Sequence, residues 1–411
     1  MNVLRVGGGG AVGQFLVIAA SPLLTRLFEP TDFGVYAIYT SVVIVAGTVA
    51  CLRFDVAIPV PRLDSTAVAL GRLATGTLLT IAVLSAIFVA VAVAGRLGGL
   101  KLSLTPGAAA GLIFLGVVGY GGYQLLNYWA IRRHLYKSLA QTRVTRGVMQ
   151  VVFQVATGLI GTGAVGLMLG HALGHLSGLV AIGRDFFRHL VRRPLKWSRL
   201  LWTARRYRRF AVFSTPAALI SSATLQLPPV LLALLYDPVA AGYFAIAQRV
   251  VATPAGIIGL AISQVFMSET MVLVRSSRRK MRVLYLRALA STFIIGLVPI
   301  GLIAVGGPWL FGLVFGDQWS EAGNFVRAMS IMFITQFAVY PVSQTLHAIE
   351  RTDLQLLYDI VRMVLGVGTL VGLGLLHVAP VAALLGYSIA LAAAYLFYMW
   401  LGYRALGNGL T

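Results

Sequence analysis

The sequence predicts an all-α integral membrane protein of about twelve transmembrane helices in two six-helix bundles, related by a pseudo-two-fold axis along the membrane normal. Three observations lead to this fold class. Of the 411 residues, 58% are hydrophobic and only 11% are charged, and the mean hydropathy is +0.86. Apolar stretches of about 20 residues, long enough to cross a hydrocarbon core of about 30 Å as helices, recur along the chain. The third observation is a motif that occurs once in each half of the chain.

Gly, Pro and charged residues between the apolar stretches set the limits of the predicted spans. The fifth and sixth spans are the shortest, and only Gly161-Thr162-Gly163 separates them. The even number of spans predicts that both termini lie on the same side of the membrane. We expect the spans near 6–27, 35–53, 72–95, 106–131, 147–161, 164–183, 210–235, 239–268, 288–315, 325–347, 356–376 and 380–402.

The positions of the basic residues predict the orientation and the domain boundaries. Most of the 33 lysines and arginines fall in alternate loops, so the positive-inside rule places both termini in the cytoplasm. Segment 184–209 mixes aromatic side chains with cations, which is typical of a cytoplasmic linker lying on the anionic inner leaflet. We expect an N-terminal bundle at 1–183 and a C-terminal bundle at 210–411. Nucleic acid is not an expected partner, because the charge is gathered in loops.

An internal repeat supports the two-bundle arrangement. Residues 28–38 align without gaps with residues 236–246, and an aromatic residue, an acid, Pro, Gly, a second aromatic residue, Ala and Ile coincide. Each copy joins the first predicted span of its half to the second. We expect the acid and Pro to end one helix and open the next, and Gly to allow the turn. Two bundles of shared orientation predict a central cavity and transport by alternating access.

Five segments, in order along most of the chain, carry a resemblance to one known family. The first contains Ser21-Pro22, Arg26 and Asp32-Phe33-Gly34, and the others cover 52–61, 242–254, 262–266 and 315–323. The chain resembles the polysaccharide-transporter branch of the multidrug/oligosaccharidyl-lipid/polysaccharide (MOP) exporter superfamily, which includes Wzx-type O-antigen flippases. The length departs from that of relatives with fourteen spans, such as many lipid II flippases.

The resemblance implies a flippase that moves undecaprenyl-pyrophosphate-linked oligosaccharide across the bacterial inner membrane. Its direction would be from the cytoplasmic to the periplasmic leaflet, for the biosynthesis of lipopolysaccharide or another surface polysaccharide. Polysaccharide assembly proteins are the partners that such a family implies, besides the lipid-linked substrate and the membrane lipids. The identity of the sugar does not follow from the resemblance.

A pyrophosphate head group inside a membrane requires cations that face a cavity. Arg249 is the first candidate, since it lies about ten residues, or about 15 Å, into the eighth predicted span. Its structural alternative is a bond to the carbonyls of a broken helix. Arg26 lies near the outer end of the first span, where it could also pair with Glu29 or Asp32. Four further candidates lie at inner helix ends, where topology is the alternative role: Arg53, Arg133, Arg351 and Arg362.

Asp359 is three residues from Arg362 and is expected to pair with it. Uncharged polar residues within the spans are candidates for binding sugar hydroxyls. They could equally bond one helix to another. These residues are Gln14, Gln124, Asn127, Gln226, Gln248 and Gln264.

Other motifs point to no enzyme activity, cofactor or metal. Residues 8–13 match the pattern G-x-G-x-x-G, but no strand precedes them, so close helix packing is the better interpretation. His171 and His175 share one helix face without a third ligand, which does not make a metal site. Cys51 is the single cysteine and excludes a disulfide.

Three rival functions stay open on the sequence. A drug or small-molecule exporter of the same superfamily would carry carboxylates inside the membrane, and only Asp359 fits that position. A membrane polysaccharide polymerase or ligase would need a large outer loop, whereas every predicted outer loop is about ten residues or shorter. A scaffold for an assembly complex would tolerate loss of Arg249.

Overall fold

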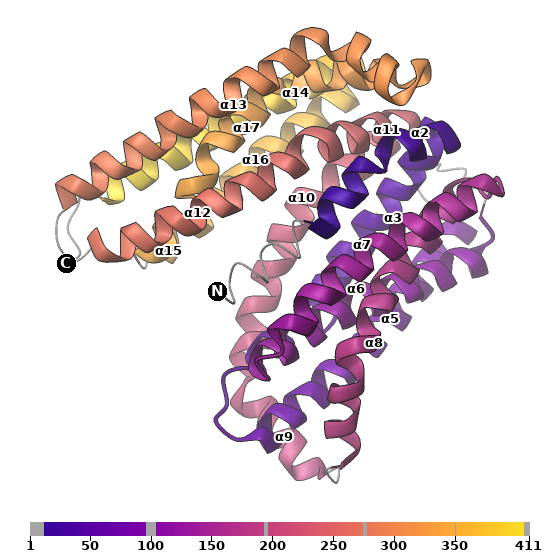
Figure 1. Cartoon of the computed structure of the whole chain (residues 1–411), viewed down its shortest axis with the longest axis vertical. Helices are drawn as coiled ribbons and strands as arrows, with labels where there is room; N and C mark the ends of the chain where they lie inside the picture. Colours follow the sequence, from indigo (N-terminus) through magenta and orange to yellow (C-terminus); the bar gives the residue numbers. More distant parts are fainter. Residues whose placement is uncertain (1–11, 96–103, 193–195, 274–277, 350, 407–411) are drawn as a thin grey trace. The chain divides into compact units, whose positions relative to one another are not determined.

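The computed structural model describes residues 12–95, 104–192, 196–273, 278–349 and 351–406. Every regular element among these residues is helical (Figure 1). Contacts divide the chain into two compact units, residues 1–234 and 235–411. The division lies near residue 235, whereas the sequence places the start of the second bundle at residue 210. The predicted boundaries 1–183, 184–209 and 210–411 therefore stay a prediction.

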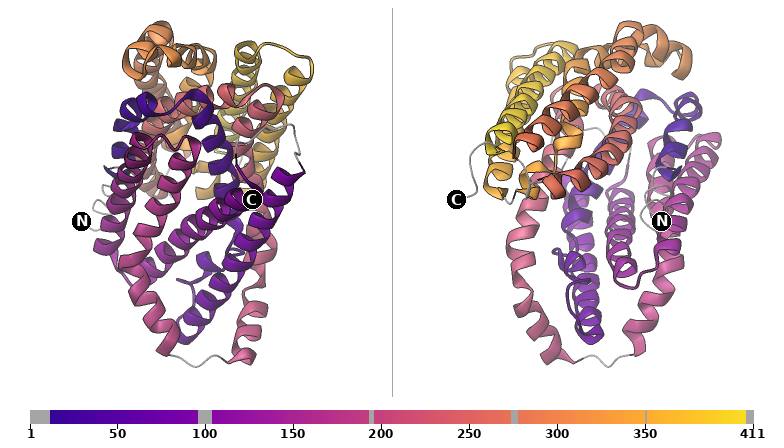
Figure 2. Two further views of the ribbon diagram at one scale, coloured as in Figure 1. Left: turned by 90° about the vertical axis from the view of Figure 1, so that its right-hand side faces the viewer. Right: turned by 60° about the vertical axis from the view of Figure 1, so that its left-hand side comes forward.

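The first unit contains an apolar helix at Val12–Leu27, whose second part is α2. Figures 1 and 2 show its longer helices from indigo to pink. In chain order the elements are α2 (Ser21–Leu27), α3 (Pro30–Val49), α4 (Phe54–Ala57), α5 (Asp64–Ala94), α6 (Pro106–Arg132), α7 (Tyr136–Leu159), α8 (Ala164–Arg192), α9 (Trp197–Arg206), the π-helix η2 (Phe210–Ser214) and α10 (Thr215–Leu235).

The second unit is built around four long helices, because α14 packs along both α13 and α17 and α17 also packs along α16. Figure 2 shows this bundle in orange to yellow. In chain order the elements are α11 (Pro238–Ala247), the π-helix η3 (Gln248–Ala252), α12 (Thr253–Leu273), α13 (Arg278–Phe315), the 3-10 helices η4 (Asp317–Trp319) and η5 (Tyr340–Val342) on either side of α14 (Ser320–Val339), α15 (Thr345–Ala348), α16 (Thr352–Leu375) and α17 (Pro380–Ala405).

Within the described ranges, nine helical stretches are long and apolar enough to cross a membrane, and α8, bent between Val180 and Ile182, makes a tenth if counted as one span. The prediction of a helical, multi-pass membrane protein is therefore confirmed. The other two of the twelve predicted spans are not confirmed. The span at 6–27 lies partly outside the described residues, and the span at 147–161 falls in α7.

Helix α7 differs from the other long helices because one of its faces is polar. It begins at Tyr136 rather than at the predicted residue 147, and it carries Arg143, Arg146, Gln150 and Gln154. These side chains lower the mean hydropathy of the helix, although its 24 residues are long enough to cross the bilayer. Gln150 and Gln154 are buried. We infer that α7 spans the membrane with its polar face turned to other helices.

The repeated motif starts helices as the sequence predicts. Glu29 and Asp32 form a capping box at the start of α3, and Asp237 accepts a hydrogen bond from the backbone of Ala240 at the start of α11, at 2.6 Å. The glycine of the motif, however, makes no turn. Gly34 is buried inside α3 and Gly242 is buried inside α11. Of the motif residues, the acid and Pro are therefore the ones that begin each helix.

The joint between α7 and α8 depends on glycine. Gly161 and Gly163 adopt φ of +75° and +57°, a left-handed conformation that disfavours other residues. Close packing by small residues was predicted for the motif at residues 8–13. It is found at Gly13, the glycine of the motif that the structure describes. A side chain on Gly13 would meet the backbone of Arg143, and a side chain on Gly147 would meet the backbone of Gly13. Residues 8–10 lie outside the described part of the chain.

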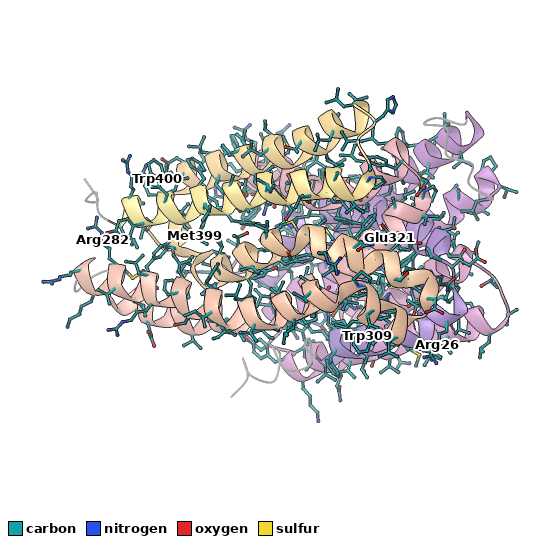
Figure 3. The ribbon with its side chains drawn as sticks, turned by 90° about the horizontal axis from the view of Figure 1, so that it is seen from above. Arg26, Arg282, Trp309, Glu321, Met399 and Trp400 are labelled. Atoms are coloured by element: carbon teal, nitrogen blue, oxygen red, sulfur yellow. The ribbon has the colours of Figure 1, made fainter. Side chains whose placement is uncertain are left out.

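Both units have a firmly packed interior. In the first unit, Trp129 and Phe186 are almost fully buried and form an edge-to-face pair with ring centroids 5.3 Å apart. In the second unit, Arg282, Met399 and Trp400 lie at one end of the bundle and Glu321 at the other (Figure 3).

Candidate functional site

Arg146 lies well inside α7, the helix that we infer to span the membrane. It is about ten residues after the start of the helix, or about 15 Å along it, which would be near the middle of a bilayer. The predicted span at 147–161 leaves Arg146 in the preceding inner loop, which is wrong because α7 begins at Tyr136 and contains Arg146. Counting charges in loops cannot distinguish an arginine at a helix end from one inside a polar-faced helix.

An aromatic ring and an imidazole hold the guanidinium of Arg146. Its central carbon lies 4.9 Å from the centroid of the Tyr123 ring, and its Nη1 lies 3.4 Å from His175 Nε2. Its Nε is buried and makes no hydrogen bond to a described residue. Since a guanidinium carries five N–H donors, Arg146 has capacity left for an anionic ligand.

His175 faces Arg146 as a hydrogen-bond acceptor. Its Nδ1 lies 2.9 Å from the backbone oxygen of His171, and because a carbonyl only accepts, Nδ1 must carry the proton. The neutral ring then presents the lone pair of Nε2 to Arg146. The imidazole thus orients the guanidinium without neutralising its charge.

Further aromatic side chains extend this group across the unit. The ring of His171 lies 4.4 Å from that of His175 and makes edge contacts with Tyr36 and Tyr39 of α3. We call this group the Arg146 cluster; it comprises Tyr36, Tyr39, Tyr123, Arg146, His171 and His175.

The two histidines do not form part of a metal site, since among the described residues no group of three or more His, Cys, Asp or Glu could hold a metal ion.

Arg53 and Asp55 form a second polar group beside the end of α3. Arg53 has a left-handed backbone with φ of 56°, and its side chain bonds to Tyr128. Asp55 is 2% exposed and its Oδ1 makes no hydrogen bond to a described residue. Burial raises the pKa of the Asp55 carboxyl, and the nearby Arg53 only partly opposes this effect.

Tyr120 of α6 connects the two groups. Its hydroxyl interacts with Gln124, and both Arg53 and Arg146 lie close enough to act on it electrostatically. The structure therefore brings the predicted residues Arg53 and Gln124 towards the Arg146 cluster. Asn127 lies on the same helix and donates a hydrogen bond to the backbone of Tyr123 at 2.8 Å, so its amide serves the helix itself.

Arg362 holds the corresponding place in the second unit. The sequence analysis assigned it to an inner helix end, which is wrong, because it lies about ten residues into α16. Its side chain is 14% exposed, and its Nη2 lies 3.9 Å from Asp359 Oδ1, which confirms the predicted pair. Its guanidinium carbon lies 5.6 Å from the centroid of the Tyr358 ring, and it also bonds to Tyr395.

Arg249 lies in the π-helical turn η3, between α11 and α12. The turn interrupts a helical stretch that runs from Pro238 to Met267, and Thr253 Oγ1 bonds to the backbone oxygen of Gln248 at 3.4 Å. Single π-turns widen a helix locally and are frequent at functional sites. The half-buried Arg249 and Gln248 are thus at an irregular point within a membrane span, and a broken helix was the basis of the structural alternative for Arg249.

The remaining predicted cations lie at helix ends. Arg26 is exposed near the end of α2. Arg133 lies 3.9 Å from Asp185, which also accepts a hydrogen bond from Trp129 at 2.9 Å. Arg351 forms a 2.8 Å ion pair with Asp353. The acid partners of Arg133 and Arg351 favour a structural role for both.

The remaining predicted amides do not gather at one point. Gln14 and Gln264 are exposed. Gln226 of α10 accepts a hydrogen bond from Ser41 of α3 at 3.3 Å, at the side of an apolar groove of about 490 Å³ between α3, α5 and α10. The groove has Val45, Phe88 and other apolar side chains on its walls and suits a hydrocarbon chain.

Comparison with known proteins identifies the family. The model of the family described as polysaccharide biosynthesis protein matches residues 23–324, which is most of the chain. The chain belongs to this family. No curated protein sequence matches it significantly.

Solved structures define the fold more closely. A structure described as the lipid II flippase MurJ in an inward closed conformation is 13% identical with a TM-score of 0.73, covering 98% of this chain and 87% of the other. An inward-facing multidrug resistance transporter of the MATE family is 14% identical with a TM-score of 0.56, covering 100% and 96%. A MOP-superfamily transporter from Pyrococcus furiosus is also 14% identical, with a TM-score of 0.53, covering 99% and 96%.

The chain is therefore a multi-pass membrane protein with the fold of the MOP transporters. Solved structures that share this fold are described as multidrug resistance transporters and as a lipid II flippase.

Proposed function

We propose that this protein is a flippase for undecaprenyl-pyrophosphate-linked oligosaccharide, working by alternating access. The observation that carries the proposal is the depth of three arginines. Arg146, Arg249 and Arg362 each lie about ten residues into a long helical stretch. A charge near the bilayer centre costs about 2.5–3.5 kcal/mol on insertion scales, so arginines at this depth mark a functional path.

The chemistry of these side chains fits a phosphate ligand. Arginine binds phosphate oxygens through two parallel N–H donors, and it keeps its charge in an apolar environment. The Arg146 cluster adds tyrosine and histidine rings, which suit the faces of sugar rings as well as cations. A cationic drug would instead require acidic side chains, and the deeply placed Asp359 is already paired with Arg362.

The comparisons support a lipid-linked substrate. The family description refers to polysaccharide biosynthesis, and one of the similar structures is described as a lipid II flippase. Together with the net charge of +21 gathered in alternate loops, they support a place in the bacterial inner membrane with both termini in the cytoplasm. The product would be a polymer of the cell surface such as O-antigen, made with polysaccharide assembly proteins as partners.

Depletion of the protein in its native host tests the proposal. We expect lipid-linked oligosaccharide to accumulate and surface polysaccharide to disappear, and mass spectrometry of the accumulated lipid identifies the sugar. Normal levels of both, together with altered drug sensitivity, would support the exporter alternative. A drop in polymer length with normal transfer across the membrane would support a polymerase or ligase.

A further inference from the structure

Helices α7 and α8 of the first unit and helices α16 and α17 of the second unit are copies of one another. Residues from Tyr136 onward align without gaps with residues from Thr352 onward, at the constant offset of 216 residues that separates Arg146 from Arg362. The helix limits follow the same offset, because α7 and α16 begin and end at equivalent residues and α8 and α17 begin at equivalent residues. The identical pairs include Arg146 with Arg362, Val148 with Val364, Val151 with Val367, Val155 with Val371, Gly158 with Gly374, Leu159 with Leu375, Gly170 with Gly386 and Arg188 with Arg404.

Arg146 and Arg362 are therefore equivalent residues of an internal repeat, at the same depth in equivalent helices. Their environments share the same chemistry. The guanidinium carbon of each lies within 6 Å of a tyrosine ring centroid, at 4.9 Å from Tyr123 and at 5.6 Å from Tyr358. In each, the Nε is buried and makes no hydrogen bond to a described residue.

The position equivalent to His171 in the second unit is Tyr387. His171 belongs to the Arg146 cluster, and Tyr387 lies close enough to Arg362 for the two to interact electrostatically. An aromatic side chain at this helix position thus accompanies the arginine in both copies. Both copies of the repeat therefore place a guanidinium among aromatic rings, whereas the ion pair with an acid occurs beside Arg362 and not beside Arg146 among the described residues.

The charge of Arg146 is not neutralised within its own unit. Among the described residues no carboxylate lies within 4 Å of it, and its polar neighbour His175 is uncharged with a proton on Nδ1 alone. Arg362 is paired with Asp359, but the 3.9 Å distance is longer than a charge-assisted hydrogen bond, so donors of its guanidinium are left for an anionic ligand. A cation left without a counter-charge in an apolar region is stabilised when an anion binds beside it.

We infer that Arg146 and Arg362 are repeat-equivalent phosphate-binding residues, each within its own unit, for the anionic head group of a polyprenyl-diphosphate lipid. This inference rests on the proposed function and adds to it that two of its arginines are equivalent positions of the internal repeat and bind phosphate in the same way. The tyrosine beside each arginine holds the guanidinium plane, so that its free N–H edge is available to two phosphate oxygens.

The test measures binding of undecaprenyl pyrophosphate to the full-length protein in nanodiscs. The variants are Arg146→Gln, Arg362→Gln and the double variant. The controls are Arg188→Gln and Arg404→Gln, because these arginines form another identical pair of the same repeat but are exposed. We expect each of the first two substitutions to raise the Kd about tenfold or more, and the controls to leave it unchanged. Thermal melting verifies that each variant is folded.

If Arg146→Gln or Arg362→Gln does not fold, binding is measured instead with Arg146→Lys or Arg362→Lys. Lysine keeps the charge but lacks the planar pair of donors, so a folded lysine variant should bind several-fold more weakly than the wild type. Unchanged Kd values in the folded glutamine or lysine variants, with tight binding by the wild type, would overturn this inference alone. A folded wild type that binds no polyprenyl diphosphate would overturn the proposed function and this inference with it. Inorganic pyrophosphate is the second probe, and equally tight binding of it would show a site for free phosphate instead of a lipid head group.

Discussion

Asp32 at the start of α3 accepts a hydrogen bond from the backbone N–H of Ala164 at the start of α8, with 2.8 Å between Oδ1 and N. Its other oxygen accepts a hydrogen bond from the backbone N–H of Glu29 at 3.1 Å. One carboxylate therefore serves the beginnings of two helices that are far apart in the sequence. This double role gives a physical reason for the acid at this position of the Glu29–Gly34 motif.

Replacement of Asp32 by Ala is expected to lower the free energy of unfolding by about 1–2 kcal/mol, since it removes the hydrogen-bond acceptor at both helix starts. Asp32→Asn keeps one oxygen for Ala164 and should lose about half as much. Thermal or denaturant unfolding in detergent measures both values. Equal stability of the alanine variant and the wild type would show that neither hydrogen bond contributes.

A second prediction concerns the crossing of the helix Val12–Leu27 with α7. A methyl group on Gly147 would meet the backbone of Gly13, so Gly147→Ala should separate the two helices and destabilise the protein by about 1–3 kcal/mol. The matched control is Gly76→Ala in α5, where nothing lies within 4 Å of the added methyl group. Because alanine favours a helix over glycine by up to about 1 kcal/mol, the control should be as stable as the wild type or more stable. A stable Gly147→Ala variant would contradict the close crossing.

Hydropathy located the apolar helices from the sequence because their side chains face lipid over much of the surface. It failed for α7, since a helix that turns Arg146, Gln150 and Gln154 to its neighbours has too low a mean hydropathy to stand out. The error then passed to the site, because an arginine assigned to a loop was counted as a topology signal. The missing information was in the sequence: the alignment of 136–159 with 352–375 places Arg146 and Arg362 at one helix position.

The buried Asp55 leads to a prediction about pH. It lies between the spans α3 and α5, and burial raises the pKa of its carboxyl above the usual value of about 4. A raised pKa in the folded state means that Asp55 contributes stability at pH below its unfolded pKa and loses this contribution as pH rises through the folded value. At neutral pH the charged carboxylate therefore costs stability.

Asp55→Asn removes that cost. The melting temperature of this variant should exceed that of the wild type at pH 7–8, and the difference should shrink as the pH falls towards 4. Melting curves across this range measure the effect. Asp317→Asn at an exposed position is the control and should leave the curve unchanged. A difference that grows towards low pH would mean that Asp55 is stabilised as a carboxylate by Arg53.

The position of α9 at the membrane surface is a further prediction. Trp197 and Leu201 lie one helical turn apart and are 72% and 57% exposed, whereas Arg199 and Arg206 lie on another side of the helix. An interfacial helix of this kind places its apolar side chains among the acyl chains and its arginines at the head groups. Nitroxide labels on cysteines at 197 and 201, in a Cys51→Ala background, should be more accessible to oxygen than to a water-soluble nickel complex. Labels at 199 and 206 should show the reverse, and a water-like signal at 197 would exclude the interfacial position.

Substitution of Arg249 tests whether the side chain in the π-turn takes part in transport. Its place in η3, within the stretch Pro238–Met267, puts a guanidinium where the helix is locally widened. If this side chain binds the substrate during its passage, Arg249→Ala should reduce surface polysaccharide at least tenfold with normal amounts of protein in the membrane. Arg249→Lys should retain part of the activity, because it keeps the charge without the paired donors. Arg287→Ala, at an exposed position of α13, is the control and should remain active. Normal polysaccharide in Arg249→Ala cells would assign Arg249 to the helix structure alone, and it would leave Arg146 and Arg362 as the intramembrane arginines that handle the head group.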